Sequence, residues 1–284
     1  MSQFLLGDAQ PFHGKCVWVT GAAQGIGLQI AQSFLQLGAR VIGIDRHFPS
    51  GEVPAKERDV FGVEQGSLGV EQNGIEQVLL DITDPMQVAR ISAQLVAEGM
   101  APQVLVNAAG ILRLGRLDTL AIDDWQACFD VNVSGVFYLL RSLMPHFKAQ
   151  ASGSIVNVAS NAAHVPRVNM GAYCASKAAL VSLSHCVALE LAEYGVRCNL
   201  VSPGSTDTPM LRAMLGDADV QQNAAELFAP TIRGLPEQYK LGVPLKKVAT
   251  AQEIANTVLF LASDCASHIT MQDIVVDGGA TLAA

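Results

Sequence analysis

The strongest constraint on the fold is a regular alternation of short apolar runs with helix-length amphipathic stretches. Seven runs rich in β-branched residues are expected to form strands, at residues 16–20, 40–45, 77–80, 104–107, 154–159, 197–201 and 274–276. Helical patterns separate them, at residues 25–37, 86–98, 125–147, 173–193 and 252–262. This alternation predicts successive right-handed βαβ crossovers within one sheet. We therefore expect residues 1–284 to form a single α/β domain, a doubly wound parallel sheet of seven strands with helices on both faces.

The composition fits a sheet that is covered on both sides. Hydrophobic residues make up 50% of the chain and charged residues 15%, against a charged share of about 25% in typical soluble domains. Strands that are buried on both faces need such a composition. The formal net charge of −8 argues against a nucleic-acid surface, which would carry clustered Lys and Arg. It leaves room for an anionic small molecule, because a pocket can carry a local positive charge.

The sequence carries no clear targeting, membrane or metal signal. Residues 1–12 contain no basic leader followed by an apolar run, and no uninterrupted apolar stretch reaches the roughly 18 residues of a membrane helix. The six cysteines form no C-x-x-C pair and have no His at metal-ligand spacing; they are Cys16, Cys128, Cys174, Cys186, Cys198 and Cys265. We therefore expect a cytoplasmic protein with free thiols and no metal.

Two segments interrupt the alternation. Residues 48–76 are rich in Gly, Glu and Gln and hold few large apolar side chains, so they are expected to form a flexible surface insertion. Residues 206–248 lie between the sixth strand and the last helix and are partly helical in pattern. This second segment is expected to form a substrate loop or lid.

A glycine-rich turn follows the first predicted strand. The segment from Thr20 to Gly27 reads T-G-A-A-Q-G-I-G, and a helix begins within it. The pyrophosphate of a dinucleotide needs backbone N–H donors at close range, which glycines permit and a helix N-terminus favours. The spacing G-x-x-x-G-x-G departs from the commoner G-x-G-x-x-G, and tight turns also use glycine for steric reasons. The turn predicts a dinucleotide site when it is taken together with the strand ends that follow.

Polar or small residues end the next three strands. Asp45 ends the second strand, at the interval where an acidic residue meets the adenosine ribose, and it would repel the 2′-phosphate of NADP. It could also be a turn residue. Arg46 would favour NADP, but its side chain is expected to point away from Asp45. Asp81 and the segment 107–110 close the third and fourth strands, where ligands of open α/β sheets bind. The pattern predicts NAD.

Tyr173 and Lys177 lie one helical turn apart on the same face of a predicted helix. Removing hydride from a secondary alcohol requires loss of the hydroxyl proton, and Tyr173 is the candidate general base. A free phenol has a pKa of about 10, so a neighbouring Lys177 ammonium and the positive nicotinamide ring are expected to favour the phenolate. Ser160, at the end of the fifth strand, would hydrogen-bond the substrate oxygen.

These motifs together resemble the short-chain dehydrogenase/reductase superfamily. The resemblance covers nearly the whole chain and is carried by residues 20–27, 107–110, Asn132, Ser160, Tyr173, Lys177, Pro203 and Gly204. It implies a Rossmann-type oxidoreductase with Asn132, Ser160, Tyr173 and Lys177 as its catalytic residues, in which Asn132 anchors a water that relays protons from Lys177. The predicted cofactor site comprises Gly21, Gln24, Gly25, Ile26, Gly27, Asp45, Asp81, Asn107, Ala108, Gly110, Tyr173, Lys177, Pro203, Gly204 and Thr206.

Four blocks are similar to one branch of this family, at residues 107–113, 162–167, 201–208 and 267–279. That branch oxidises a carboxylate-bearing cyclohexadiene diol in catecholate siderophore biosynthesis, and the reaction makes the ring aromatic. The substrate carboxylate would want an arginine, whose planar guanidinium binds carboxylates bidentately. The predicted substrate contacts are Ser160, Tyr173, His164 and Arg167, with Arg113 and Arg212 as rivals for the carboxylate. The segment 48–76 is longer than this branch leads us to expect.

Several alternatives stay open from the sequence. A 3-oxoacyl-carrier-protein reductase or another short-chain alcohol dehydrogenase would share the catalytic set, and the former would prefer NADPH and a basic partner surface. A non-catalytic NAD sensor would tolerate loss of Ser160 or Tyr173, and both are present. A purely structural protein would have no reason to align polar groups at strand ends. The resemblance also implies a homotetramer, in which the apolar faces of helices 125–147 and 173–193 and of the block 274–284 pair across two-fold axes.

Overall fold

Seven parallel strands form the centre of the computed structural model, which describes residues 10–48, 71–72, 74–217 and 223–282. Their order across the sheet is β4-β2-β1-β5-β6-β7-β10. The bounds are β1 Cys16–Thr20, β2 Arg40–Asp45, β4 Ile75–Leu79, β5 Val104–Asn107, β6 Gly153–Val158, β7 Val196–Pro203 and β10 Asp273–Val276. The chain winds outward from β1 through β2 to β4 and then returns to the other side of β1 at β5. The doubly wound parallel sheet predicted from the sequence is confirmed.

The edge beside β4 differs from the expectation. A short strand, β3 (Glu71–Gln72), pairs antiparallel with β4, and β4 itself begins at Ile75, two residues before the predicted start. The last residues of the predicted 48–76 insertion therefore belong to the sheet. At its other end, Phe48 is partly buried against the hydrophobic core. The rest of that segment, residues 49–70 and 73, lies outside the described residues.

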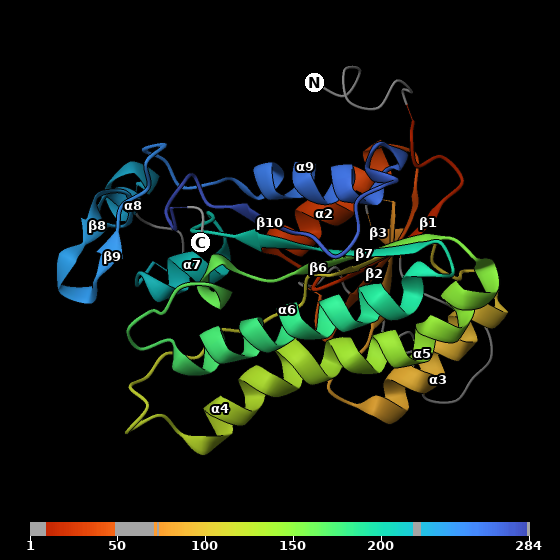
Figure 1. Ribbon diagram of the computed structural model, residues 1–284, viewed down its shortest axis with the longest axis horizontal. Helices are drawn as coiled ribbons and strands as arrows, with labels where there is room; N and C mark the ends of the chain where they lie inside the picture. The colour runs from red at the N-terminus through yellow and green to blue at the C-terminus, as the bar shows by residue number, and fades with distance from the viewer. Residues whose placement is uncertain (1–9, 49–70, 73, 218–222, 283–284) are drawn as a thin grey trace.

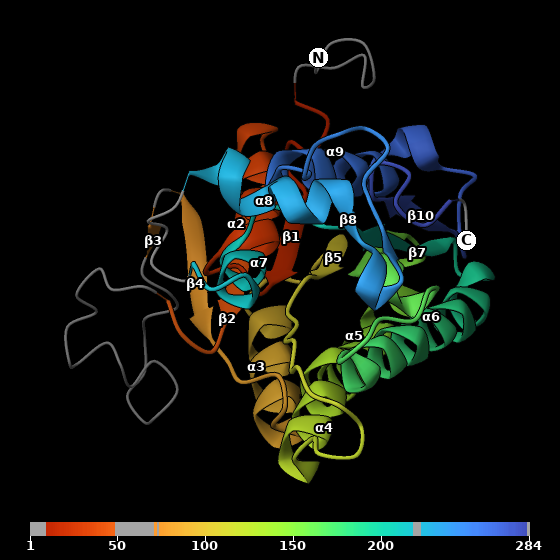
Figure 2. The same ribbon diagram turned by 90° about the vertical axis from the view of Figure 1, so that its left-hand side faces the viewer.

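Helices cover both faces of the sheet (Figures 1 and 2). Helices α2 (Gly25–Gln36) and α9 (Ala251–Ala262) lie on one face, and α3 (Pro85–Ala97), α5 (Gly135–Gln150) and α6 (Gly171–Ala192) lie on the other. Each strand contributes side chains to the core on both faces of the sheet, because successive side chains point to opposite faces. In β1, Val17 and Val19 pack with α2 and α9, whereas Trp18 packs with α3, α5 and α6.

The single helix predicted at residues 125–147 is divided in the structure. Helix α4 (Ile122–Phe129) runs into a π-helical turn at Asp130–Ser134, and α5 continues from Gly135. A Cβ on Gly135 would stand 2.7 Å from the Ile82 side chain, so glycine allows α5 to pack closely there. Such wide turns occur mostly as one-turn interruptions of α-helices at functional sites.

Helix α6 is the one helix of the described part of the chain whose length and hydropathy would suit a membrane span. Two of its polar side chains are instead bound within the fold. Lys177 donates to the carbonyl of Val158 at 2.8 Å, and Ser184 accepts from Asn157 at 2.8 Å, both from β6. Helix α6 is therefore a core helix that packs against the sheet.

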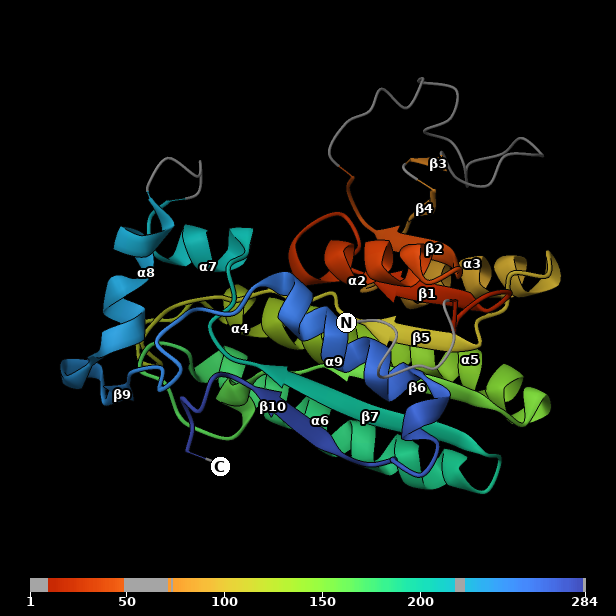
Figure 3. The same cartoon turned by 90° about the horizontal axis from the view of Figure 1, so that it is seen from above.

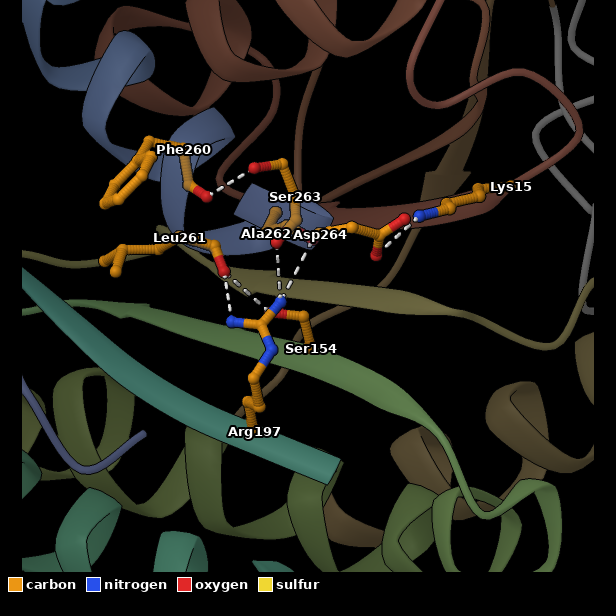
Figure 4. A network of polar contacts seen from close by, with 8 residues as sticks. All are labelled: Lys15, Ser154, Arg197, Phe260, Leu261, Ala262, Ser263 and Asp264. Carbon is orange, nitrogen blue, oxygen red and sulfur yellow. Dashed lines mark hydrogen bonds and ion pairs between the residues drawn. The ribbon is translucent and has the colours of Figure 1, made fainter. Parts of the chain in front are cut away.

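Arg197 at the start of β7 binds the C-terminal end of α9 (Figure 4). Its guanidinium donates to the carbonyls of Leu261, Ala262 and Ser263 at 2.5, 3.3 and 3.1 Å. A cation at this position stabilises the negative end of the helix dipole. The contact ties α9 to the amino-terminal edge of the sheet.

The carboxyl-terminal edge carries a separate small layer. After β7 follow α7 (Pro209–Met214), α8 (Ala224–Arg233) and a hairpin of β8 (Gly234–Leu235) and β9 (Lys240–Leu241). Seen from above, this layer projects beyond the end of the strands (Figure 3). The sequence expectation of a partly helical segment at 206–248 is confirmed for the described residues, which exclude 218–222.

Candidate functional site

Two adjoining cavities open at the carboxyl-terminal edge of the sheet. The smaller, here the glycine cavity, has a volume of about 240 Å³ and is lined by the turn at Gly21–Gly27 and by the ends of β2 and β4. The larger, here the tyrosine cavity, has a volume of about 400 Å³ and is lined by Ser160, Tyr173 and the α7–β9 layer. They share Ile26, Ala108, Gly110, Thr208 and Met210. The two cavities therefore form one continuous site.

The glycines of the β1–α2 turn are required by close packing. Gly21 has a φ of +68°, and a Cβ there would stand 2.8 Å from Ala109. A Cβ on Gly27 would stand 2.1 Å from the carbonyl oxygen of Gly21. Larger residues would push α2 away from β1 and fill the space beside the turn. The turn is thus a cradle kept open by glycine.

The N-terminus of α2 suits an anion. Its N-cap residue, Gln24, makes no side-chain cap, and the first turn contains no acidic residue. By contrast, Asp84 caps α3 by accepting from the amides of Met86 and Gln87. The amides of the first turn of α2 therefore point at the glycine cavity without a capping side chain, as a pyrophosphate site requires. The residues present fit a dinucleotide.

Asp45 and Arg46 both line the glycine cavity. The Asp45 carboxylate accepts from the amide of Ala23 at 3.2 Å and from that of His47 at 3.3 Å. It is thus a turn residue and a cavity residue at once. Arg46 borders the same cavity, and the expectation that its side chain points away from Asp45 stays a prediction.

The ends of β4 and β5 complete the glycine cavity. Asp81 lines it and accepts from the amide and the hydroxyl of Thr83 at 2.9 and 2.8 Å. Ala108 also lines it, and its amide is held by the Thr20 hydroxyl at 3.1 Å. Asn107 borders neither cavity: it is buried and donates to Asn157 at 2.7 Å. It lies beneath the predicted cofactor site.

The predicted catalytic residues converge on the tyrosine cavity, except for Asn132. Ser160, Tyr173 and Lys177 line it, as do Pro203, Gly204 and Thr206. The ammonium of Lys177 lies 5.9 Å from the centre of the Tyr173 ring. Ser160 follows β6 by two residues in an extended conformation, and its hydroxyl accepts from the amide of Ala162 at 3.2 Å. The geometry brings a phenol, a hydroxyl and an ammonium together.

Burial dominates the electrostatics of this group. Burial raises the pKa of Tyr173 to about 12, and a hydrogen bond with Ser160 opposes the rise. Burial also lowers the pKa of Lys177 to about 8. The Lys177 ammonium donates to the carbonyl of Val158. The expected stabilisation of the phenolate by Lys177 and a bound nicotinamide ring stays a prediction.

Asn132 sits in the π-helical turn and is fully buried. Its amide oxygen accepts from the Ile111 amide at 2.9 Å, and its amide nitrogen donates to the Ile111 carbonyl and the Ser176 hydroxyl, each at 3.0 Å. A Cβ on Gly110 would stand 3.3 Å from both Asn132 Oδ1 and Lys177 Nζ. Asn132 thus clamps the loop after β5 beside the lysine.

The structure separates the three candidate arginines. Arg167 lines the tyrosine cavity and forms no ion pair with any described residue. Burial lowers the pKa of its guanidinium. Arg113 lies outside both cavities and binds Asp124 at 3.0 Å. Arg212 is also outside, bound to Asp207 at 2.7 Å and to Asp217 at 2.9 Å. Only Arg167 of the three presents an unpaired cation to the cavity.

His164 is not part of the site. Its ring nitrogen Nε2 lies 2.8 Å from the carboxylate of Asp273 in β10, and the same carboxylate accepts from the hydroxyl of Ser202 at 2.9 Å. His164 borders neither cavity. The predicted substrate contact is replaced by a contact between the loop after β6 and the edge strand.

Lys240 is a cavity residue that the sequence reasoning missed. It lies in β9 and lines the tyrosine cavity. Burial lowers the pKa of its ammonium, and repulsion from Arg167 lowers it further. No motif surrounds Lys240, and only the fold of residues 224–241 brings it to Arg167. Among the described residues, no group of three or more His, Cys, Asp or Glu side chains could hold a metal ion.

Comparisons with known proteins agree on one family. The family model described as enoyl-(acyl carrier protein) reductase matches residues 21–281. The 2,3-dihydro-2,3-dihydroxybenzoate dehydrogenase of Escherichia coli K12 is 51% identical over 96% of this chain and 99% of its own length. The enzyme of the same name from Bacillus subtilis 168 is 43% identical over 97% of this chain and 99% of its own length.

Solved structures are similar over the whole fold. The ligand-free aldohexose dehydrogenase of Thermoplasma acidophilum has a TM-score of 0.81 at 30% identity and covers 98% of both chains. ElxO with NADP bound has a TM-score of 0.76 at 26% identity, covering 94% of this chain and 99% of the other. The similarity therefore extends over both cavities.

Proposed function

Because the chain belongs to the short-chain dehydrogenase/reductase family, we propose that it is an NAD-dependent dehydrogenase that oxidises 2,3-dihydro-2,3-dihydroxybenzoate to 2,3-dihydroxybenzoate in siderophore biosynthesis. Identity of 51% over nearly the full length of the Escherichia coli enzyme supports this substrate. The structural observation that carries the proposal is Arg167, an unpaired guanidinium in the same cavity as Ser160 and Tyr173. A carboxylate beside an oxidisable ring hydroxyl matches this arrangement.

The residues of the tyrosine cavity divide the work of binding and proton transfer. Arg167 holds the substrate carboxylate, and its planar guanidinium fixes the orientation of the ring. Ser160 donates to the oxygen of the reacting hydroxyl, and Tyr173 accepts the hydroxyl proton as general base. Bound NAD supplies the acceptor for the hydride that leaves the ring carbon. The resulting dienone tautomerises to a catechol, and the gain of aromaticity makes the overall oxidation favourable.

Lys177 supports Tyr173 during this step. With a pKa of about 8, Lys177 is mostly charged at pH 7 although it is buried. The pKa of Tyr173 is about 12, so the phenolate needs a nearby positive charge to form at neutral pH. An ammonium 5.9 Å from the ring centre can supply it when the phenol loses its proton. Asn132 is a positioning residue, because it holds the loop at Ile111 and Gly110 against Lys177.

The family uses NAD(P), and Asp45 favours NAD within this chain. Its carboxylate lies in the glycine cavity at the end of β2, where it would accept from a ribose hydroxyl and repel a 2′-phosphate. Arg46 lines the same cavity and opposes this preference. An oxidation also suits NAD. The test is turnover with NAD and the dihydrodiol against turnover with NADPH and an acetoacetyl thioester.

A 3-oxoacyl-carrier-protein reductase is the second candidate, since the 3-oxoacyl-(acyl-carrier-protein) reductase of Salmonella typhimurium is 34% identical over 94% of this chain. The tyrosine cavity disfavours this function, because its unpaired cations would form no ion pair with an uncharged thioester. Turnover of the acetoacetyl thioester with NADPH, together with no turnover of the dihydrodiol, would reverse this assignment.

We also propose that the chain forms one domain, in which residues 206–248 act as a lid over the substrate. In the cytoplasm, four copies of this domain assemble into a homotetramer. Exposed apolar side chains on the outer helices support the assembly: Trp125 on α4, Phe137 on α5 and Leu189 on α6. All six cysteines are free, which suits a reducing compartment. Light scattering at micromolar concentration tests the assembly, and a monomer mass would refute it.

A further inference from the structure

The β8–β9 hairpin is held in one position by its neck. Gly234 has a φ of +92°, and a Cβ there would stand 2.7 Å from the amide of Gly242. A Cβ on Gly242 would stand 2.4 Å from the carbonyl oxygen of Ile232. The amide of Val243 donates to that same carbonyl at 2.9 Å. The two glycines thus let the strands close tightly on the end of α8, so the direction of the hairpin is set.

Lys240 is the charged side chain that this hairpin contributes to the tyrosine cavity. It forms no ion pair with any described residue, although the ammonium is partly withdrawn from water. Its neighbour Tyr239, with a φ of +54°, turns outward at the tip and is exposed. The hairpin therefore directs a cation inward and an aromatic ring outward.

The charges that line the tyrosine cavity have one sign. The ionisable residues among its described lining are Arg167, Tyr173, Lys177 and Lys240, and no Asp or Glu is present. Yet the whole chain carries a formal net charge of −8. Arg167 and Lys240 repel each other. The Asp277 carboxylate favours the charged form of Arg167 from outside the cavity lining, but a buried charge without an ion-pair partner is costly. The arrangement becomes favourable when an anion lies between the two cations.

We propose that Lys240 is a second cation for the substrate carboxylate and that the β8–β9 hairpin thereby determines the preference for acidic ring alcohols. This inference rests on the proposed oxidation of a carboxylate-bearing diol. Arg167 approaches from the loop after β6, and Lys240 approaches from the α7–β9 layer. The carboxylate is then held from two elements that are far apart in the chain. An alcohol without the carboxylate would leave both cations unpaired, so the site selects against it.

Steady-state kinetics of Lys240→Met with saturating NAD test the proposal. We expect KM for the dihydrodiol to rise about ten- to a hundredfold, the loss typical of a hydrogen bond to a charged group, with kcat changed far less. NAD affinity should not change. KM for a ring diol without the carboxylate should also stay the same. Lys240→Arg should restore most of the loss, because it keeps the charge. Lys246→Met is the matched control, since Lys246 is an exposed lysine of the same segment that borders neither cavity.

Calorimetry with benzoate separates this inference from the proposed function. Benzoate should bind the wild-type protein in the presence of NAD. Its affinity should fall by a similar factor in Lys240→Met and stay unchanged in Lys246→Met. If the wild type fails to oxidise the dihydrodiol but shows this pattern with benzoate, the proposed substrate is wrong and the role of Lys240 stands. Unchanged KM and unchanged benzoate affinity in Lys240→Met would overturn the role of Lys240 alone. Equal losses on both diols would do the same.

Discussion

The glycine cavity and the tyrosine cavity adjoin, but they are built in different ways. Most of the glycine cavity is made of turns that directly follow β1, β2, β4 and β5, so most of its lining residues are placed by the strand before them. The tyrosine cavity combines the N-terminal half of α6 with α7, α8 and a hairpin that follows β7 by about thirty residues. Its lining is placed by contacts between segments distant in sequence. The glycine cavity therefore depends mainly on local structure, whereas the tyrosine cavity depends on tertiary contacts.

This difference corresponds to two kinds of ligand. A dinucleotide presents a pyrophosphate and a ribose, and the helix terminus and strand-end carboxylate that bind them can be reused for any substrate. The organic substrate varies from enzyme to enzyme, and the α7–β9 layer that lines the tyrosine cavity lies outside the sheet (Figure 3). Changes in that layer can alter Arg167's surroundings without moving the sheet. The site therefore has a conservative half and an adaptable half.

The sharpest test of the division is Tyr173→Phe. The phenol lines only the tyrosine cavity, so its hydroxyl should matter for the chemical step and little for cofactor affinity. General acid–base groups contribute about 10²–10⁴-fold, and kcat should fall by that factor. NAD binding, measured by calorimetry, should stay near the wild-type value. A variant that kept more than a tenth of kcat would remove Tyr173 from the role of base.

Lys177 lies near the boundary of the two cavities and should report its burial through stability. Its pKa is lowered from the ordinary 10.5 to about 8 by burial. Between these values the unfolded chain holds the proton and the folded chain does not, so stability rises with pH in that window. The gain should reach about 3 kcal/mol near pH 10.5. Below pH 8 both states hold the proton, and no such slope arises.

Urea unfolding of the wild type and of Lys177→Met at pH 7, 8, 9 and 10 measures this effect. The free energy of unfolding of the wild type should rise relative to that of the variant as the pH increases above 8. Tyr173, with its raised pKa, acts in the opposite direction only above its ordinary value of 10. A difference between the two proteins that is the same at every pH would show that Lys177 is not desolvated in solution.

Arg167→Met tests whether the tyrosine cavity alone recognises the carboxylate. KM for the dihydrodiol should rise about ten- to a hundredfold, while a ring alcohol without the carboxylate should be affected little. Arg113→Met is the control, because Arg113 is bound to Asp124 outside both cavities. Equal losses on the two alcohols would make Arg167 a structural residue.

Asp45→Ala should have the smallest effect on catalysis. The effect should be limited to cofactor binding in the glycine cavity. The change removes an acceptor for the ribose and the repulsion of a 2′-phosphate together, so the preference of kcat/KM for NAD over NADP should narrow by about tenfold. KM for the dihydrodiol at saturating cofactor should not move. An unchanged cofactor ratio would leave Asp45 as a turn residue that binds the amides of Ala23 and His47.

The residues of the glycine cavity were predicted from the sequence better than those of the tyrosine cavity. Hydrophobic alternation placed every strand of the parallel sheet within two residues, and the glycine turn, Asp45 and Asp81 fall where strand ends require. The predictions failed where the position of a side chain depends on contacts with segments far along the chain. His164 binds Asp273 of β10, and Lys240 enters the site only through the hairpin. No periodicity or spacing encodes those pairings.

A chain that lost one residue from Asp130–Ser134 could still be helical from α4 to α5. Each residue of an α-helix turns the chain by about 100°, so the deletion would rotate one helix against the other by that angle. Either α5 would lose its apolar contacts with the sheet, or Asn132 would lose Ile111 and Ser176. The extra residue therefore sets the rotation between Asn132, which binds the loop beside the site, and α5, which packs against the core. Single-residue insertions and deletions here should be tolerated far less than substitutions on the exposed faces of the same helices.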